Sequence, residues 1–383
     1  MPAFDLILAA FVFAFGACIG SFLNVVVYRL PVGKSLGGFS HCPSCDHRLG
    51  PLDNIPILGW PSLGGKCRYC KTPFSVRYPL VELITALLFL GYWLALTRFG
   101  LGPALCEVVV DPIRGNTTAF TTLGDVPLEA AWPILVMVLL LVAVLLAASL
   151  IDAEHFIIPL ELPYFVGVVG LLVHVLADSA DLPGNLLIDG VWANAAFGGT
   201  VGLLVSIALL KAGVFKVSFA DDAPPIEVGG DDAPEPWPAS KVRAEIRHEI
   251  VFLLPPILAA TVGYFLPSFD LPTWAQAFAG VLLGALAGGG VVWVIRILGS
   301  YGFGKEAMGL GDVHLMVGVG ACLGWWPTVV AFFLAPFFAL PLTGAVWLFT
   351  GKRHLPFGPY LAAGTAAVIL LWQPIGQYLM VLC

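Results

Sequence analysis

Long apolar runs alternate with short polar segments along the whole chain. Many runs approach the roughly 20 residues that a helix needs to cross the hydrocarbon core of a bilayer. This pattern predicts ten helical spans, at about 4–28, 79–97, 132–151, 162–178, 190–213, 248–267, 274–298, 312–324, 327–349 and 357–379. The span at 312–324 is short, so we expect it to pack inside the bundle or to tilt. The pattern therefore predicts an all-α polytopic membrane protein with about eight to ten transmembrane helices.

The composition agrees with this prediction. Of the 383 residues, 59% are hydrophobic and 11% are charged, and the mean hydropathy is +0.93. Soluble domains carry about 25% charged residues, so a soluble globular protein is excluded. The first apolar run has no basic segment before it and carries Asp5 near its start, unlike a cleaved signal peptide, so we expect a retained helix.

The basic residues predict an orientation. Sixteen Lys and Arg fall in loops on one side of the predicted spans, and only Arg98 and Arg114 fall on the other side. Because cytoplasmic loops are enriched in Lys and Arg, the N-terminus is expected outside. The segments expected to face the cytosol are 29–78, 152–161, 214–247, 299–311 and 350–356.

Polar segments divide the chain into five expected parts. The 29–78 segment is rich in Gly and Pro and holds four of the eight cysteines, so it is expected to form a small cytosolic domain inserted after the first helix. The acidic, Pro-rich stretch within 216–247 is typical of a disordered linker. The parts are the first helix at 1–28, the cysteine domain at 29–78, helices at 79–189, two inserted helices and the linker at 190–270, and the last helices at 271–383.

The cysteines of this domain form two Cys-x-x-Cys pairs, Cys42 with Cys45 and Cys67 with Cys70. Two such pairs suit a tetrahedral zinc site, because each tight turn presents two thiolates to one ion. A disulfide or redox pair is the alternative, but the predicted cytosolic location is reducing. His41 and His47 are nearby and could also ligate a metal. Since a segment of about 50 residues has little core, a metal would contribute much of its folding free energy.

Two aspartates are expected at the cytosolic ends of different helices. Asp152 ends the span at 132–151, and Asp312 begins the span at 312–324. Each has an ordinary alternative, since Asp312 could cap its helix and Asp152 could mark the membrane boundary. Together they suggest a catalytic dyad, in which one ionised carboxylate activates water and its protonated neighbour polarises a carbonyl group. Both charges would require a hydrated cleft instead of lipid.

Glycines flank these positions. Gly309 and Gly311 would let the backbone turn sharply and let a substrate strand approach Asp312. Gly280, Gly284 and Gly288, spaced by four, predict a close helix contact that would help to bring Asp152 and Asp312 together.

Several motifs together resemble the type IV prepilin peptidases, also called prepilin leader peptidase/N-methyltransferases. These motifs follow the family's order and spacing: GSFLNVVVYRLP at 20–31, the paired cysteines, DNIPILGW at 53–60, RYPLVELITALLF at 77–89, IDAEHFIIP at 151–159, KEAMGLGDVHL at 305–315 and LPFGPYLA at 355–362. The chain departs from the family pattern at Leu160 and His314, and the segment at about 190–270 is longer than usual.

The resemblance implies a Gly-x-Gly-Asp aspartic endopeptidase of the bacterial inner membrane. It places Asp152 and Asp312 on the catalytic positions and Cys42, Cys45, Cys67 and Cys70 on the zinc positions. It implies that prepilin-like precursors are cleaved at the cytosolic membrane face, and that S-adenosylmethionine then methylates the new N-terminus. Glu82, Glu154 and Glu306 could hold the basic leader of the substrate, or could be ordinary interfacial residues.

The partners implied are prepilin-like proteins of pili or type II secretion and the lipid bilayer, with no nucleic acid. The sequence does not determine self-association, and no methyl-donor contacts are assigned. A proton- or cation-coupled transporter is the main alternative, because intramembrane aspartates also relay ions. It would leave the four cysteines unexplained, whereas a non-catalytic zinc scaffold would leave both aspartates unexplained.

Overall fold

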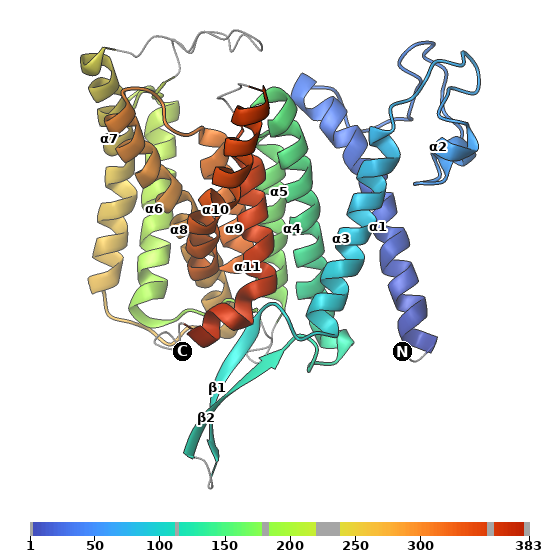
Figure 1. Ribbon diagram of the computed structural model, residues 1–383. Coiled ribbons are helices and arrows are strands. Elements are labelled where there is room, and N and C mark those ends of the chain that lie inside the picture. Colours follow the sequence, from blue (N-terminus) through green and yellow to red (C-terminus); the bar gives the residue numbers. More distant parts are fainter. Residues whose placement is uncertain (1–2, 112–114, 178–183, 220–237, 351–355, 379–383) are drawn as a thin grey trace. The chain divides into compact units, whose positions relative to one another are not determined.

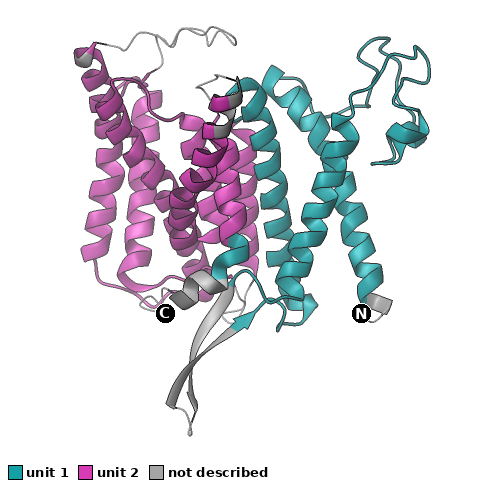
Figure 2. Ribbon diagram, in the orientation of Figure 1, with its two compact units in different colours: residues 1–159, 369–383 teal, residues 160–368 magenta. Residues whose placement is uncertain are grey.

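The computed structural model describes residues 3–111, 115–177, 184–219, 238–350 and 356–378 (Figure 1). The chain forms two compact units (Figure 2). The first unit comprises Met1–Pro159 and Ile369–Cys383, and the second comprises Leu160–Val368. Of the predicted acidic linker, residues 220–237 lie outside the described part of the chain.

Each of the ten predicted spans coincides with one described helix. These helices are α1 (Ala3–Arg29), α3 (Arg77–Thr97), α4 (Leu128–His155), α5 (Glu161–Leu176), α6 (Gly190–Lys211), α7 (Ala239–Phe265), α8 (Thr273–Phe303), α9 (Leu310–Leu323), α10 (Trp325–Thr350) and α11 (Gly358–Tyr378). Among the described residues, seven helices are long and apolar enough to cross a membrane, whereas α5, α9 and α11 have shorter apolar stretches. The predicted helical, polytopic membrane fold is therefore confirmed.

In the first unit, α1 and α3 pack closely because two glycines of α1 face α3. A Cβ added to Gly16 would lie 2.8 Å from the Cβ of Phe89, and one added to Gly20 would lie 2.7 Å from the Cα of Glu82. Small residues spaced by four let helix backbones approach and gain dispersion contacts, which drive helix association in lipid. The GSFLN motif thus fixes the helix pair that carries the cysteine segment.

The cysteine segment joins α1 to α3 and contains little regular structure. It holds two short 3₁₀ turns, η1 (Leu30–Val32) and η2 (Pro51–Asn54), and the single-turn helix α2 (Gly59–Ser62). Its shape is therefore set by turns and side-chain contacts.

The segment between α3 and α4 contains a hairpin that the apolar pattern does not predict. Strands β1 (Ala104–Asp111) and β2 (Gly115–Thr122) pair antiparallel, with Ala104 opposite Thr122. The β-branched residues of this segment favour strands. The hairpin lies outside the apolar runs, and the periodicity of a helix gives no signal for it.

In the second unit, α6 and α7 form an antiparallel pair that meets backbone to backbone (Figure 1). A Cβ on Gly198 would collide with the carbonyl oxygen of Ala259, one on Gly202 with that of Pro255, and one on Gly263 with that of Asn194. The segment at 190–270, expected as an insertion between the two aspartates, therefore contains a tightly packed helical hairpin, which also contacts α8.

Helix α9 packs between α5 and α8. A Cβ on Gly318 would lie 2.8 Å from the carbonyl oxygen of Pro163 in α5, and one on Gly284 of α8 would collide with the carbonyl of Gly320. Ten of the 14 residues of α9 are buried. A helix of this length is only about 21 Å long, less than the roughly 30 Å of a bilayer core. The short span therefore packs inside the bundle, one of the two outcomes expected from the sequence.

Candidate active site and metal centre

The four cysteine side chains converge in the first unit. Their Sγ atoms lie within 4.8 Å of one another, with 3.7 Å between Cys42 and Cys70 and 4.0 Å between Cys45 and Cys67. A tetrahedral ion with metal–sulfur bonds of about 2.3 Å separates its ligands by about 3.8 Å. All four are free thiols, so the alternative of a disulfide is not seen. The set fits one tetrahedral metal ion.

The two cysteine pairs share one turn geometry. The amide of Asp46 donates to the carbonyl of Cys42 at 2.9 Å, and the amide of Lys71 donates to that of Cys67 at 3.1 Å. Asp46 and Lys71 have φ of 54° and 60°, the left-handed conformation that reverses the chain within a few residues. Each turn therefore directs its two thiols toward the same point.

Side chains from the linking motif hold the second cysteine turn. The carboxylate of Asp53 accepts hydrogen bonds from Arg68, 3.0 Å from its Nε, and these bonds hold the pKa of Asp53 below its ordinary value. The indole of Trp60 donates to the carbonyl of Phe74 at 3.0 Å and packs under Gly65. His47, considered above as a ligand, stacks on the ring of Tyr69.

Polar bonds also tie this segment to α1 and α3. The amide of Ile57 donates to the carboxylate of Glu82 at 2.6 Å, and the amide of Asn24 donates to the carbonyl of Tyr78 at 3.1 Å. The guanidinium of Arg29 holds the carbonyl of Gly37 at 2.9 Å. The candidate metal centre is therefore fixed to one end of the α1–α3 pair.

Asp152 lies at this same end of the first unit. It is buried in the last turn of α4, and its carbonyl accepts the amide of Phe156, which has φ of 55°. Glu154 forms an ion pair with Arg77, the first residue of α3. The start of α3, which follows the cysteine segment, thus lies beside the turn that carries Asp152.

A polar hollow of about 330 Å³ lies at the opposite end of α3, lined by Thr97, Arg98, Phe99, Gly100, Thr122, Gly124 and Asp125. A helix of the length of α3 spans about 32 Å. The hollow is therefore remote from the cysteines and from Asp152, and it holds none of the predicted site residues.

Asp312 lies in the second unit, buried in the first turn of α9. The N-cap residue is Gly309, so Asp312 is the third residue of the helix and does not occupy the N-cap position considered above. Gly309 has φ of −70° and ψ of 150°, which any residue can adopt, so the backbone conformation at this position does not require glycine. A Cβ on Gly309 would lie 3.7 Å from Oδ2 of Asp312. Glycine therefore places no side chain beside this carboxylate oxygen.

Helix α5 supports the start of α9. The rings of Tyr164 and His314 meet edge to face with their centres 6.0 Å apart, and Nδ1 of His314 lies 2.7 Å from the carbonyl oxygen of Leu310. Position 314, where the resembling family commonly has Lys, is thus held by contacts within its own unit.

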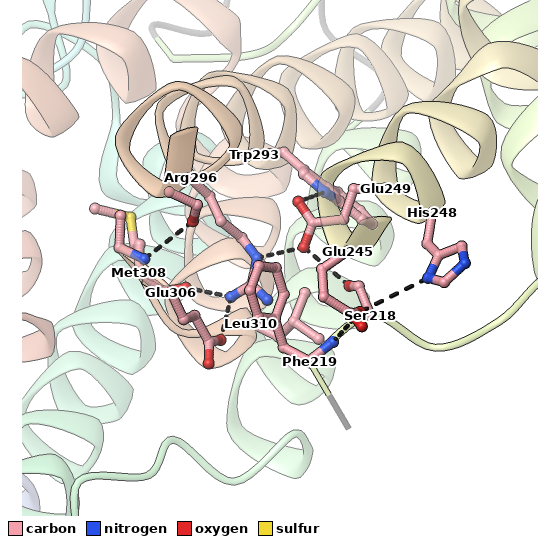
Figure 3. Close-up of polar contacts among 12 residues, drawn as sticks. Ser218, Phe219, Glu245, His248, Glu249, Trp293, Arg296, Glu306, Met308 and Leu310 are labelled. Carbon is pink, nitrogen blue, oxygen red and sulfur yellow. Dashed lines mark hydrogen bonds and ion pairs between the residues drawn. The ribbon is translucent and has the colours of Figure 1, made fainter. Parts of the chain in front are cut away.

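The segment before α9 is held by a buried arginine, Arg296, which is one of the sixteen basic residues that predict the orientation (Figure 3). Arg296 bonds to Glu249 at 2.7 Å, to Glu306 at 2.6 Å and to the carbonyl of Met308. Arg296 is counted with the basic loop residues, but it and Glu249 lie just inside the ends of the predicted spans 274–298 and 248–267. Charges at such positions are energetically costly and usually functional, so they were a signal that the sequence offered.

The three glutamates considered for leader recognition each have a partner within the chain. Glu82 accepts the amide of Ile57, Glu154 pairs with Arg77, and Glu306 pairs with Arg296. Each therefore has a structural contact of its own.

Two segments of the chain match models of known protein families. Residues 14–96 match the bacterial peptidase A24 N-terminal domain, and residues 245–344 match the type IV leader peptidase family. The first match contains the four cysteines, and the second contains Arg296 and Asp312. Asp152 lies between the two matches.

Several curated relatives are similar along nearly their full length. A prepilin leader peptidase/N-methyltransferase of Myxococcus xanthus is 30% identical over 96% of this chain and 91% of its own. Proteins of the same name from Burkholderia pseudomallei and Aeromonas hydrophila are 26% and 28% identical, over 95% and 94% of this chain and 86% and 89% of their own. No solved structure matches the chain.

Proposed function

The chain belongs to the type IV leader peptidase family, and we propose that it removes the leader peptide of prepilin-like precursors and then methylates the new N-terminal amine. It is an enzyme and a peptidase, built as a multi-pass protein of the inner membrane. The similarity along 96% of the chain carries most weight, because it joins the cysteine segment and the Asp312 motif in one protein. A transporter would need neither.

We propose Asp152 and Asp312 as the catalytic dyad. The two motifs that carry these residues, IDAEHFIIP at 151–159 and KEAMGLGDVHL at 305–315, support this pairing, because both resemble aspartate motifs of the family and lie in one chain that is similar to a relative along 96% of its length.

The two helix ends suggest different roles for the two acids. Asp152 lies in the last turn of its helix, where the helix dipole opposes a negative charge, and Asp312 lies in the first turn of its helix, where the dipole favours one. In our proposal the Asp312 carboxylate takes a proton from water, whose oxygen attacks the scissile carbonyl. The Asp152 carboxyl donates its proton to the carbonyl oxygen, and collapse of the intermediate returns a proton to the leaving amine.

The substrate class follows from the location. A prepilin-like precursor has an apolar helix in the bilayer and a basic leader in the cytosol, so its scissile bond lies at the cytosolic membrane boundary. With the orientation predicted by the basic residues, the ends of α4 and α9 that carry the aspartates face that side. Because Gly309 has no side chain, an extended strand could approach its backbone close to Asp312.

We propose that the four cysteines hold a structural zinc ion. The S₄ donor set and its spacing favour zinc, and the closed shell leaves no position for a substrate. The ion would stabilise the turns between α1 and α3. S-adenosylmethionine is the second substrate of the methylation step, and the sequence and structure assign no residue to it.

The deciding experiment compares cleavage of a prepilin-like substrate by membranes containing the parent protein, Asp152→Asn or Asp312→Asn. We expect each variant to lose at least about 10³-fold in rate, because neither amide can transfer the required proton. Asn keeps the size of the side chain, so the yield of folded protein should match the parent.

Glu161→Gln is the matched control, since it removes a carboxylate from the first turn of α5, close to the proposed dyad in sequence. It should cleave at the parent rate. Undiminished cleavage by either aspartate variant would overturn the dyad. Ion-coupled transport by reconstituted protein, lost in both variants, would favour the transporter instead.

A further inference from the structure

Arg296 is completely buried near the end of α8 and faces three acceptors (Figure 3). Its Nε donates to Oε1 of Glu249 at 2.7 Å. Its Nη1 donates to Oε1 of Glu306 at 2.6 Å and also to the carbonyl of Met308. One side chain therefore joins α7 to the segment that leads into α9.

Three successive residues of that segment are held by one face of α8. Glu306 and Met308 are held by Arg296, and the amide of Ala307 donates to the hydroxyl of Ser300 at 3.1 Å. The Cβ of Ala307 would lie 2.7 Å from a Cβ on Gly299, so it fits only against glycine. Positions 296, 299 and 300 are neighbours on a helix surface. The face is therefore a continuous docking strip for residues 306–308.

Residues 306–308, which dock on this face of α8, come shortly before the proposed catalytic aspartate in the chain. Met308 is followed by Gly309, the N-cap of α9, which has no side chain to anchor the helix start. Side-chain caps normally fix that position. The contacts of residues 306–308 with α8 therefore set where the first turn of α9, and with it Asp312, begins.

Glu249 holds the guanidinium of Arg296 in a fixed orientation. Its side chain is 1% exposed, whereas that of Glu306 is 36% exposed, so Glu249 is the buried counter-ion. Its second oxygen accepts from the indole of Trp293 at 3.2 Å. A buried ion pair adds little net stability compared with apolar packing, but it defines geometry, and removal of one partner leaves an unpaired buried charge.

We infer that Arg296 is a positioning residue for Asp312, and that Glu249, supplied by the inserted α6–α7 hairpin, holds Arg296 in place. This inference rests on the proposed function, because it concerns the placement of one member of the dyad. It also gives the inserted segment a role, since α7 completes the support of the helix that carries Asp312.

The test measures cleavage kinetics of purified protein with Arg296→Lys, Arg296→Gln, Glu249→Gln and Ser300→Ala. A misplacement of about 1 Å can cost about 100-fold in rate, so Arg296→Gln should lower kcat by about that factor with KM within twofold. Arg296→Lys should recover part of the rate, since one ammonium group cannot reproduce the fork of a guanidinium. Ser300→Ala removes a second anchor without changing any charge and should lower kcat several-fold.

The pH profile separates positioning from stability. The distance between two carboxyl groups decides how they share protons. Displacement of Asp312 in Arg296→Gln and Glu249→Gln should therefore shift the acidic and basic limbs of the plot of kcat against pH. A purely structural role would lower the amount of folded enzyme and leave the profile unchanged. Trp293→Phe is the matched control: it removes one bond of Glu249, leaves Glu249 bonded to Ser218 and Arg296, and should retain the parent profile.

A double-variant comparison completes the test. If Glu249 acts only through Arg296, the combined variant should lose no more than Arg296→Gln alone. Parent kcat and an unchanged pH profile in Arg296→Lys and Ser300→Ala would overturn the inference, even if Arg296→Gln fails to fold. The proposed dyad would stand in that case, because it falls only if Asp152→Asn or Asp312→Asn cleaves at the undiminished parent rate.

Discussion

Single glycines set the distance between neighbouring helices in both units. A Cβ on Gly284 would collide with the carbonyl of Gly320, and one on Gly288 with that of Met316. The expected close contact of the Gly280, Gly284 and Gly288 series is confirmed for these two residues, whose partner is α9. A Cβ on Gly280 would instead meet Leu186, in the segment before α6.

We predict that Gly284→Ala destabilises the protein by about 1–3 kcal/mol, because the added methyl group must force two backbones apart. Thermal unfolding in detergent should show a lowered Tm. Gly290→Ala, in the same helix, is the control, since a Cβ there meets nothing within 4 Å. Its Tm should stay the same or rise, because alanine favours helix. Equal Tm values for both variants would contradict the close packing of α8 on α9.

The catalytic and metal-binding candidates could be named from residue chemistry and spacing alone, but their supports could not. Arg296 and Glu249 are 47 positions apart, and Glu82 and Ile57 are 25 apart. No local sequence pattern predicts such pairs. Charged residues in apolar runs are unusual because burying a charge there costs free energy, and this was the only sign that the sequence offered.

Secondary-structure elements differ in how much they depend on their own sequence. The long helices follow from the length of the apolar runs, whereas the cysteine segment has only short turns and, in our proposal, depends on a bound metal ion for its stability. In the turn of the second cysteine pair, Lys71 takes a left-handed conformation that non-glycine residues rarely adopt. A bound ion would compensate for that strain.

We predict that the parent protein binds about one zinc ion per chain and that Cys42→Ser combined with Cys67→Ser reduces this to near zero. Structural zinc sites contribute on the order of 10 kcal/mol or more, so the segment from 30 to 76 should become sensitive to limited proteolysis. Elemental analysis and protease mapping measure the two effects. Cys18→Ser, a free thiol in α1, is the control and should change neither. Full zinc retention in the double variant would refute the S₄ site.

At the level of the full chain, the arrangement of basic residues remains a prediction about sidedness. It assigns the cysteine segment and both aspartates to the cytosol, and the β1–β2 hairpin to the outside. The dyad needs this orientation, because the leader of a prepilin-like substrate is cytosolic.

We predict that alkaline phosphatase fused within the hairpin is active and that the same reporter fused at residue 230 is inactive. A cytosolic fluorescent reporter should give the reverse pattern at the two positions. Thiol labelling in intact cells is the control, because it reports which side of the membrane a segment faces without a fused reporter. An active phosphatase at residue 230 would invert the topology and remove the proposed active site from its substrate.

The amino-acid sequence by itself determined the helical membrane fold and the places of its ten helices, and it named the four candidate cysteine ligands and the two candidate aspartates, because these depend on local apolar length and on the chemistry of individual residues. The tertiary structure decided that the short α9 packs between α5 and α8, that a β-hairpin forms, and that Arg296 docks the segment before Asp312. Such contacts join residues far apart in the chain, so the packing of helices fixes them and periodicity does not.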